Sequence, residues 1–152
     1  MNWGVRAASW ADLEALAELR AVVMRPDLER LGRYDEHRVR QRLRDAFAPE
    51  HTWVIEVDGT PAGCVALRPA RDGARWLEHF YLAPELHGQG VGSAVLGSLL
   101  ERCDREGVAV VRLNVLRGSA ARRLYERHGF AFEREDEVDV FMARHGASSG
   151  QG

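Results

Sequence analysis

Apolar and polar residues recur along this chain at intervals that predict a mixed series of strands and helices. Alternating or short continuous apolar runs predict strands, and apolar residues repeating every three to four positions predict helices. The strands predicted in this way are residues 5–8, 52–57, 62–67, 74–82, 109–116, 130–133 and 138–143. The helices are residues 13–24, a segment that begins after Asp35 and ends before Pro49, residues 94–103 and residues 119–129.

Short-range signals set the boundaries between these elements. Arg25-Pro26 is expected to end the first helix, because the residue before proline avoids helical angles, and residues 27–34 are expected to form a loop. Asp58-Gly59 is a two-residue hairpin signal, so residues 52–82 should form an antiparallel meander. The run at 109–116 is nearly continuously apolar, which is typical of a central strand. The helix that precedes it makes a crossover, so this strand should run parallel to residues 74–82.

A glycine-rich loop follows the strand that ends at Leu82. It reads His87-Gly-Gln-Gly-Val-Gly-Ser93 and leads directly into a helix. The first amides of a helix have no partner within it and carry the positive end of its dipole. Glycines at 88, 90 and 92 remove the β-carbons that would keep a bulky anion away. The loop therefore predicts an anion cradle for a phosphate or pyrophosphate, although three glycines also suit a simple turn.

The loop matches neither of two common nucleotide motifs. The dinucleotide pattern Gly-x-Gly-x-x-Gly fails because the spacing is Gly-x-Gly-x-Gly, and the Gly-Lys-Ser/Thr of a P-loop is missing from a chain that has no lysine.

Size and composition limit the function classes. With 152 residues, 45% hydrophobic and 29% charged, the chain suits one globular domain, assigned to residues 1–145, with residues 146–152 as a disordered polar tail. A formal net charge of −2 gives no electrostatic case for nucleic acid or an anionic membrane. Cys64 and Cys103 have no metal or redox spacing and are interpreted as reduced core residues. No apolar run approaches the roughly 20 residues of a membrane span, and a cytoplasmic location is the expectation.

Two motifs resemble those of the GNAT N-acetyltransferase superfamily. The family loop is Gln/Arg-x-x-Gly-x-Gly/Ala after a strand that ends two residues before a proline, which Leu82-Ala-Pro84 and residues 87–92 fit, except that His87 stands where Gln or Arg is usual. Later in the family comes Asn-x-x-Ala-x-x-Leu/Phe-Tyr-x-x-x-Gly-Phe. Residues 118–130 match its Leu-Tyr and Gly-Phe parts, but Gly118 replaces the Asn, with Ser119 beside it.

The resemblance covers about residues 3–143 and implies the GNAT fold. This is an α/β (α+β) single domain with a mixed, mostly antiparallel sheet of about seven strands flanked by four helices. It also implies acetyl-CoA as cosubstrate, with no metal. The residues implied in holding acetyl-CoA are Phe80, Leu82, His87, Gly88, Gln89, Gly90, Val91, Gly92, Ser93 and Ser119. Phe80 and Leu82 would pair through their backbones with the pantetheine arm.

Acetyl transfer to an amine needs a proton acceptor and a proton donor. By resemblance, Tyr125 lies near the coenzyme sulfur, and a phenol is protonated at neutral pH and can donate to a departing thiolate. Glu78 is a carboxylate within an otherwise apolar strand, an arrangement that is costly unless the residue is exposed or functional. It is the first candidate for the general base. His79 is the second, and Glu56 or Asn114 could instead order a water.

The residues do not identify the amine that accepts the acetyl group. A metal site at His79 and His87 lacks further ligands at suitable spacing. Two sets of charged and aromatic residues could line the acceptor site: Trp10, Arg25, Arg30, Arg33 and Tyr34, and Glu133, Glu135, Asp136 and Glu137. The acidic set would favour a cationic amine and the arginines a carboxylate-bearing one.

The expected function is therefore acetyl transfer from acetyl-CoA to a primary amine of a small molecule or peptide by direct attack. The alternative is a non-catalytic acyl-CoA-binding sensor or regulatory module. The resemblance allows a homodimer, and neither nucleic acid nor membrane is expected as a partner.

Overall fold

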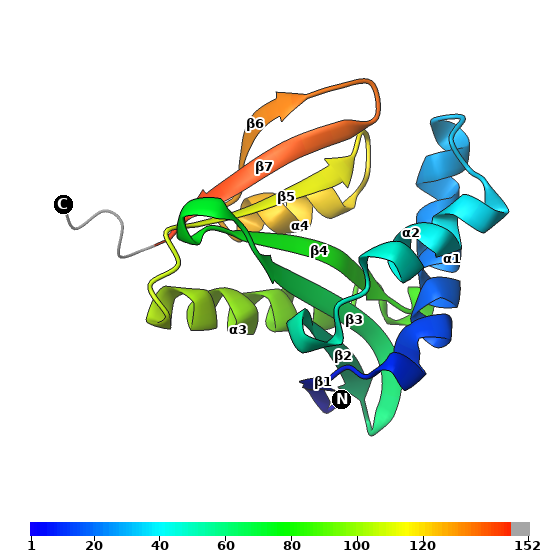
Figure 1. The fold of residues 1–152 in the computed structure, drawn as a ribbon, viewed down its shortest axis with the longest axis horizontal. Coiled ribbons are helices and arrows are strands. Elements are labelled where there is room, and N and C mark those ends of the chain that lie inside the picture. Colours follow the sequence, from blue (N-terminus) through cyan, green and yellow to red (C-terminus); the bar gives the residue numbers. More distant parts are fainter. Residues whose placement is uncertain (147–152) are drawn as a thin grey trace. The chain divides into compact units, whose positions relative to one another are not determined.

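The computed structural model describes residues 1–146 of the chain (Figure 1). The strands are β1 Trp3–Ala7, β2 Thr52–Val57, β3 Thr60–Pro69, β4 Arg75–Leu82, β5 Val110–Leu116, β6 Ala131–Glu135 and β7 Asp139–His145. The α-helices are α1 Leu13–Arg30, α2 Glu36–Ala46, α3 Val91–Arg105 and α4 Ala121–Arg127. Short 3-10 turns occupy Trp10–Asp12, Pro49–His51, Arg71–Gly73 and Pro84–Leu86. The predicted tail at 146–152 lies, beyond Gly146, outside the described residues.

The strands form one seven-stranded sheet in the order β1-β2-β3-β4-β5-β7-β6. β4 and β5 are parallel, through the pairs Arg75–Val111 and Trp76–Arg112. The pairs β1–β2, β2–β3, β5–β7 and β6–β7 are antiparallel. The predicted fold class, a mixed and mostly antiparallel sheet with four helices, is confirmed, as is the parallel crossover through α3.

The residues divide into two compact units, and β3 and β4 each contribute to both. The first unit contains residues 1–66 and 79–91, and the second contains residues 67–78 and 92–152. Among residues 1–146, no helix combines the length and the apolar character that crossing a bilayer requires.

In the first unit, α1 and α2 pack against each other (Figure 1). A buried cluster forms beneath them, made of Leu16, Ala17, Leu43, Val54, Cys64 and Tyr81. The Asp35 carboxylate accepts the Arg38 amide at 2.8 Å and caps α2, as predicted. Asp58 and Gly59 have φ of 51° and 80°, the left-handed angles that a tight β2–β3 turn requires, so the predicted hairpin is confirmed.

Pro26 lies within α1, so the predicted end of this helix before the proline is wrong. Proline removes the amide that would bond to the Val22 carbonyl four residues earlier. Val22 is 57% exposed, and water can bind that carbonyl instead. The helix continues to Arg30, and Gly32 then takes a φ of 70° just after its end. The predicted loop at 27–34 is correspondingly shorter.

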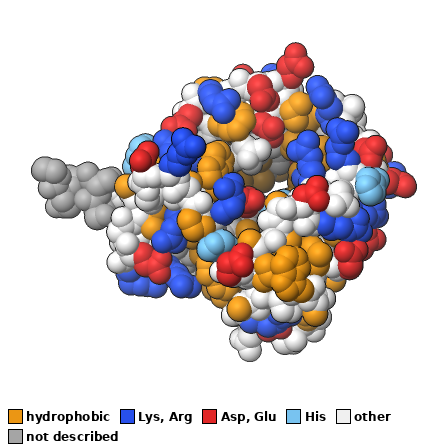
Figure 2. Space-filling model, viewed as in Figure 1, with side chains coloured by type: hydrophobic (Ala, Val, Ile, Leu, Met, Phe, Trp, Pro, Cys, Tyr) orange, Lys and Arg blue, Asp and Glu red, His pale blue; other side chains and the backbone are white. Residues whose placement is uncertain are grey.

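Helix α3, most of which belongs to the second unit, begins at Val91, three residues earlier than predicted, because part of the glycine motif is itself helical. Buried residues alternate along β5, at Val111, Leu113 and Val115, as expected for a strand with one face in the core. Cys103 is buried and free, and so is Cys64 of the first unit, as predicted. Figure 2 shows arginine and acidic side chains intermingled over the visible face, in keeping with the small net charge.

Candidate acetyl-CoA and acetyl-transfer site

The glycine loop has the backbone geometry of an anion cradle. Gly88 and Gly90 have φ of 77° and 84°, angles that side-chain-bearing residues rarely adopt. A Cβ built on either glycine would meet nothing within 4 Å, so space lies open beside the backbone. Val91, Gly92 and Ser93 form the first turn of α3, where amides have no carbonyl partner within the helix. The loop therefore suits a pyrophosphate group.

Side chains of the loop hold it to the preceding segment. The imidazole Nε2 of His87 lies 2.8 Å from the Leu82 carbonyl oxygen. Because a carbonyl only accepts, this nitrogen carries the proton and donates. Gln89 donates from Nε2 to the Glu85 carbonyl at 2.8 Å. His87, which departs from the family pattern, thus fastens the loop to the end of β4.

Ser93 in the second unit has a partner that the sequence did not reveal. Its hydroxyl lies 2.9 Å from Nε2 of His128, a residue 35 positions later at the end of α4. Burial, followed by the charges of Arg127 and Arg144, lowers the pKa of His128. The neutral imidazole is therefore favoured, and it orients the Ser93 hydroxyl.

Glu78, the first candidate for the general base, is paired with an arginine. Arg68 donates from Nε to its Oε1 at 2.8 Å, and the Glu78 side chain is 22% exposed. One carboxylate oxygen is thereby held in place. Glu78 belongs to the second unit, as does Trp76 two positions earlier on the same strand.

His79, the second candidate, belongs to a chain of hydrogen bonds in the first unit. Its Nδ1 lies 3.2 Å from the Tyr81 hydroxyl oxygen, which accepts from Arg20 Nε at 2.9 Å. Arg20 is 7% exposed and also donates from Nη1 to the Val39 carbonyl. His79 has a φ of 49°, a left-handed angle that residues with a side chain rarely adopt.

Sequence reasoning did not single out Arg20 as a site residue. The signal was present, since an arginine four residues after Leu16 falls on the apolar face of α1. A buried guanidinium needs partners, and Tyr81 and Val39 provide them.

Tyr125 is 8% exposed, and its ring meets Phe130 edge-on with centroids 5.7 Å apart. Ser119, the proposed substitute for the family Asn, accepts the Ala121 amide on its hydroxyl at 3.2 Å. This bond orders the start of α4, which is shorter than predicted.

Several residues of the two candidate acceptor sets are already engaged. Arg25 pairs with Glu29 and lies over the Tyr34 ring at 4.7 Å. In the second unit, Asp136 accepts the Asp139 and Val138 amides, and these bonds lower the pKa of its carboxyl group. Asp136 therefore stabilises the turn between β6 and β7 through these bonds. Among residues 1–146, no group of three or more His, Cys, Asp or Glu side chains is arranged to hold a metal ion.

The sequence model of the acetyltransferase (GNAT) family matches residues 13–130, which is more than half of the chain. The chain therefore belongs to the GNAT acetyltransferase family. None of the curated proteins compared matches the sequence.

Solved structures with the same fold include three of differing specificity. The PaiA N-acetyltransferase of Thermoplasma acidophilum, in complex with coenzyme A, is 23% identical, with 95% of this chain and 99% of that chain covered and a TM-score of 0.77. The ribosomal-protein-S18-alanine N-acetyltransferase of Escherichia coli is 18% identical, with 95% and 94% covered and a TM-score of 0.74. N-acetylglutamate synthase of Neisseria gonorrhoeae, complexed with coenzyme A and N-acetyl-glutamate, is 20% identical, with 95% and 35% covered and a TM-score of 0.69.

Proposed function

We propose that this protein is an acetyl-CoA-dependent N-acetyltransferase that acetylates a primary amine of a small molecule or peptide by direct attack. The observation that carries the proposal is the glycine loop, where two left-handed glycines with open space beside them lead into the first turn of α3. Family membership and the coenzyme A complexes of similar folds support the same cosubstrate.

Acetyl-CoA would be bound mostly by backbone groups of the protein. The amides of the loop and of the first turn of α3 would bind the pyrophosphate, and the backbone of β4 would pair with the pantetheine arm. The proposed contacts are Phe80, Leu82, His87, Gly88, Gln89, Gly90, Val91, Gly92, Ser93 and Ser119. The Leu82 carbonyl already accepts from His87, but a carbonyl oxygen has a second lone pair for the arm. Acetyl-CoA supplies the acyl group as a thioester.

Glu78 and Tyr125 would move the protons. Glu78 takes the proton that the attacking amine loses, directly or through a water, while the new N–C bond forms and the C–S bond breaks. Tyr125 gives its phenolic proton to the departing thiolate. Arg68 donates to one oxygen of the Glu78 carboxylate and so holds this carboxylate in position. These roles, like the contacts above, follow from the family pattern together with the local geometry.

A screen of primary amines tests the proposal by the release of free CoA thiol from acetyl-CoA. We expect turnover with at least one amine, a fall of about 10²-fold or more in kcat for Tyr125→Phe and Glu78→Gln, and unchanged acetyl-CoA affinity in both variants. The matched control Glu101→Gln, at an exposed position in α3, should keep the wild-type rate. Tight acetyl-CoA binding with no acetyl transfer to any amine would favour the non-catalytic binding module instead.

A further inference from the structure

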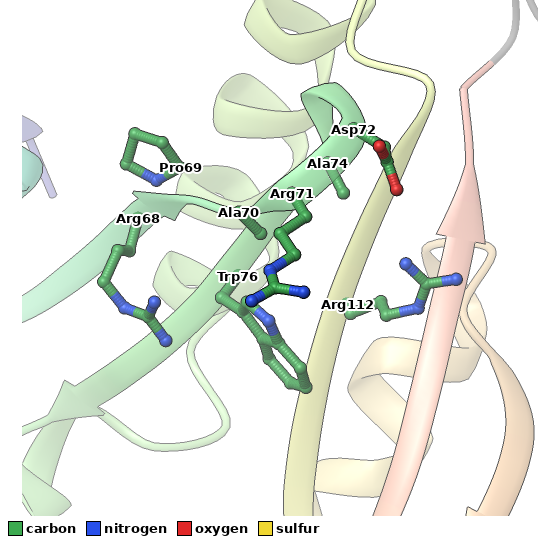
Figure 3. Close-up of a pocket in the computed structure, with 8 residues that line it drawn as sticks. All are labelled: Arg68, Pro69, Ala70, Arg71, Asp72, Ala74, Trp76 and Arg112. Atoms are coloured by element: carbon green, nitrogen blue, oxygen red, sulfur yellow. The ribbon is translucent and has the colours of Figure 1, made fainter.

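A shallow groove of about 620 Å³ in the second unit is lined by three arginines and a tryptophan (Figure 3). Arg68 and Arg71 come from the end of β3 and the turn after it, Trp76 from β4 and Arg112 from β5. In Figure 3 the Arg71 side chain extends toward the Trp76 indole, with Arg68 to one side and Arg112 to the other. Arg71, Trp76 and Arg112 have no role in the proposed chemistry, and Arg68 enters it only as the partner of Glu78.

The three arginines of the groove have N–H donors that no other protein group in the described part of the chain uses. Arg68 uses Nε for Glu78, and Arg112 uses Nε for Glu133 at 3.3 Å. Within residues 1–146, the terminal Nη nitrogens of both arginines donate to no protein group, and Arg71 makes no side-chain hydrogen bond or ion pair. Guanidinium groups with free terminal nitrogens bind carboxylates and phosphates in a fork geometry. The groove is therefore suited to an anionic group, and Arg71 is its one guanidinium without a carboxylate partner in the described part of the chain.

The rest of the groove is mostly apolar. Pro69, Ala70, Ala74 and the Trp76 indole contribute to its lining, and Asp72 adds one carboxylate. The Asp72 carboxylate repels a ligand phosphate, which carries about two negative charges, more than it repels a ligand carboxylate, which carries one. An apolar or aromatic body can pack on the indole face. The ligand that fits carries one carboxylate and an apolar side chain.

Position links the groove to the proposed chemistry. Trp76 and Glu78 lie two residues apart on β4, and side chains at this spacing share a face of a strand. Arg68 bonds to Glu78 and also lines the groove, so a carboxylate on its free nitrogens would sit beside the candidate base. An α-amino acid has its amine and carboxylate on one carbon, which matches this short separation.

We infer that the groove selects the acceptor, and that the acceptor is an apolar or aromatic α-amino acid whose carboxylate binds Arg71 and the terminal nitrogens of Arg68. This inference rests on the proposed function, because it assigns the groove to the amine substrate of the same site. Arg71 is a specificity-determining residue in this account, and Trp76 supports the side chain of the acceptor.

Three matched amines test the carboxylate requirement: L-phenylalanine, L-phenylalaninamide and phenethylamine. The amide has the least basic amine of the three and is most often neutral, so amine reactivity alone favours the amide. We expect wild-type kcat/KM to be at least tenfold higher for phenylalanine than for either comparison amine. Equal or greater kcat/KM for the amide would overturn the inference.

Arg71→Gln then tests the residue. Because the Arg71 side chain makes no hydrogen bond or ion pair among the described residues, the variant should fold normally. We expect KM for phenylalanine to rise tenfold or more with kcat little changed, phenethylamine kinetics to stay the same, and Arg71→Lys to recover part of the loss. Arg105→Gln removes an exposed arginine of α3 and is the control for net charge. An equal effect of Arg71→Gln on both amines, or none on either, would contradict the assignment.

The outcomes separate the two proposals. Acetylation of amines without regard to a carboxylate would remove the inference and leave the proposed function intact. Failure of acetyl-CoA to bind or to be consumed with any amine would remove the proposed function, and the inference with it.

Discussion

His87 donates a hydrogen bond from its imidazole Nε2 to the Leu82 carbonyl at 2.8 Å, and so ties the start of the glycine loop to the end of β4. Both residues belong to the first unit. The family usually has Gln or Arg at this position, and His87 keeps a donor there with a shorter reach. We infer that this bond holds Gly88 and Gly90 in their left-handed angles before the cosubstrate binds.

Replacement of His87 by alanine should therefore weaken acetyl-CoA binding. The loss of one hydrogen bond of about 0.5–1.5 kcal/mol predicts an increase in Kd of about 2- to 12-fold, measured by calorimetric titration. His87→Gln, which retains a donor, should recover most of the affinity. His37→Ala, at an exposed position in α2, is the control and should bind as the wild type does. Wild-type affinity in His87→Ala would show that the loop is ordered without this bond.

Gly63 in β3 has no room for a side chain. A Cβ at this position would lie 2.3 Å from the Tyr81 carbonyl oxygen and 3.2 Å from the Leu82 Cα, and both of these are backbone atoms that can move only with β4. We expect Gly63→Ala to lower the free energy of unfolding by about 1–3 kcal/mol or more and to weaken acetyl-CoA binding. Gly4→Ala in β1 is the matched control, because a Cβ there meets nothing within 4 Å. Denaturant unfolding of both variants gives the comparison, and equal stabilities would contradict it.

His128 should make stability fall as the pH decreases. Burial is the largest cause that lowers its pKa in the folded chain, whereas an unfolded histidine titrates at about 6.5. The unfolded state therefore binds the proton first, and the stability present above about pH 6.5 is lost as the pH falls from there toward the folded-state pKa. The free energy of unfolding should be measured between pH 7.5 and pH 5. We expect it to fall less steeply with decreasing pH in His128→Asn than in the wild type.

The variant Ser93→Ala tests whether burial of His128 or its hydrogen bond to Ser93 causes the pH dependence of stability. It removes the hydroxyl partner of His128 but leaves the ring buried, so the pH dependence of stability should persist. A slope in His128→Asn as steep as that of the wild type would assign the pH dependence to other groups.

Cys64 should be inert in the folded protein. Burial raises the pKa of its thiol to about 12, and its Sγ lies 3.1 Å from the His79 carbonyl oxygen, to which the thiol donates. At pH 8 almost none of it is thiolate, which is the reactive form. Iodoacetamide followed by peptide mass spectrometry should label Cys64 only after denaturation. Labelling of the native chain within minutes would show that this part of the core opens readily.

The fold could be predicted from the sequence largely because local signals agreed with it. The Asp58-Gly59 turn, the Asp35 cap and the apolar run of β5 each correspond to an observed feature. Pro26 was misleading because the cost of a proline inside a helix depends on whether water can reach the carbonyl of Val22, which the sequence does not show.

The candidate site could be predicted only in its backbone part. Three closely spaced glycines where a helix begins predict an anion cradle, because a glycine affects the backbone angles and the open space at its own position. The pairs Arg68–Glu78 and Ser93–His128 join residues 10 and 35 positions apart, and no periodicity indicates which side chains meet across a sheet or between helices. The groove at Arg71 was missed for the same reason.

Calorimetric titration of acetyl-CoA into the wild type, Gly90→Glu and Gly59→Glu tests the central claim most directly. Gly90 and Gly59 have nearly equal φ, 84° and 80°, and both have open space at the Cβ position, so the two variants carry the same charge and similar backbone strain. We predict micromolar binding by the wild type and by Gly59→Glu, and its loss in Gly90→Glu, because the added carboxylate would occupy the anion cradle. Equal binding by all three proteins, or none by the wild type, would contradict the assignment of this loop to acetyl-CoA.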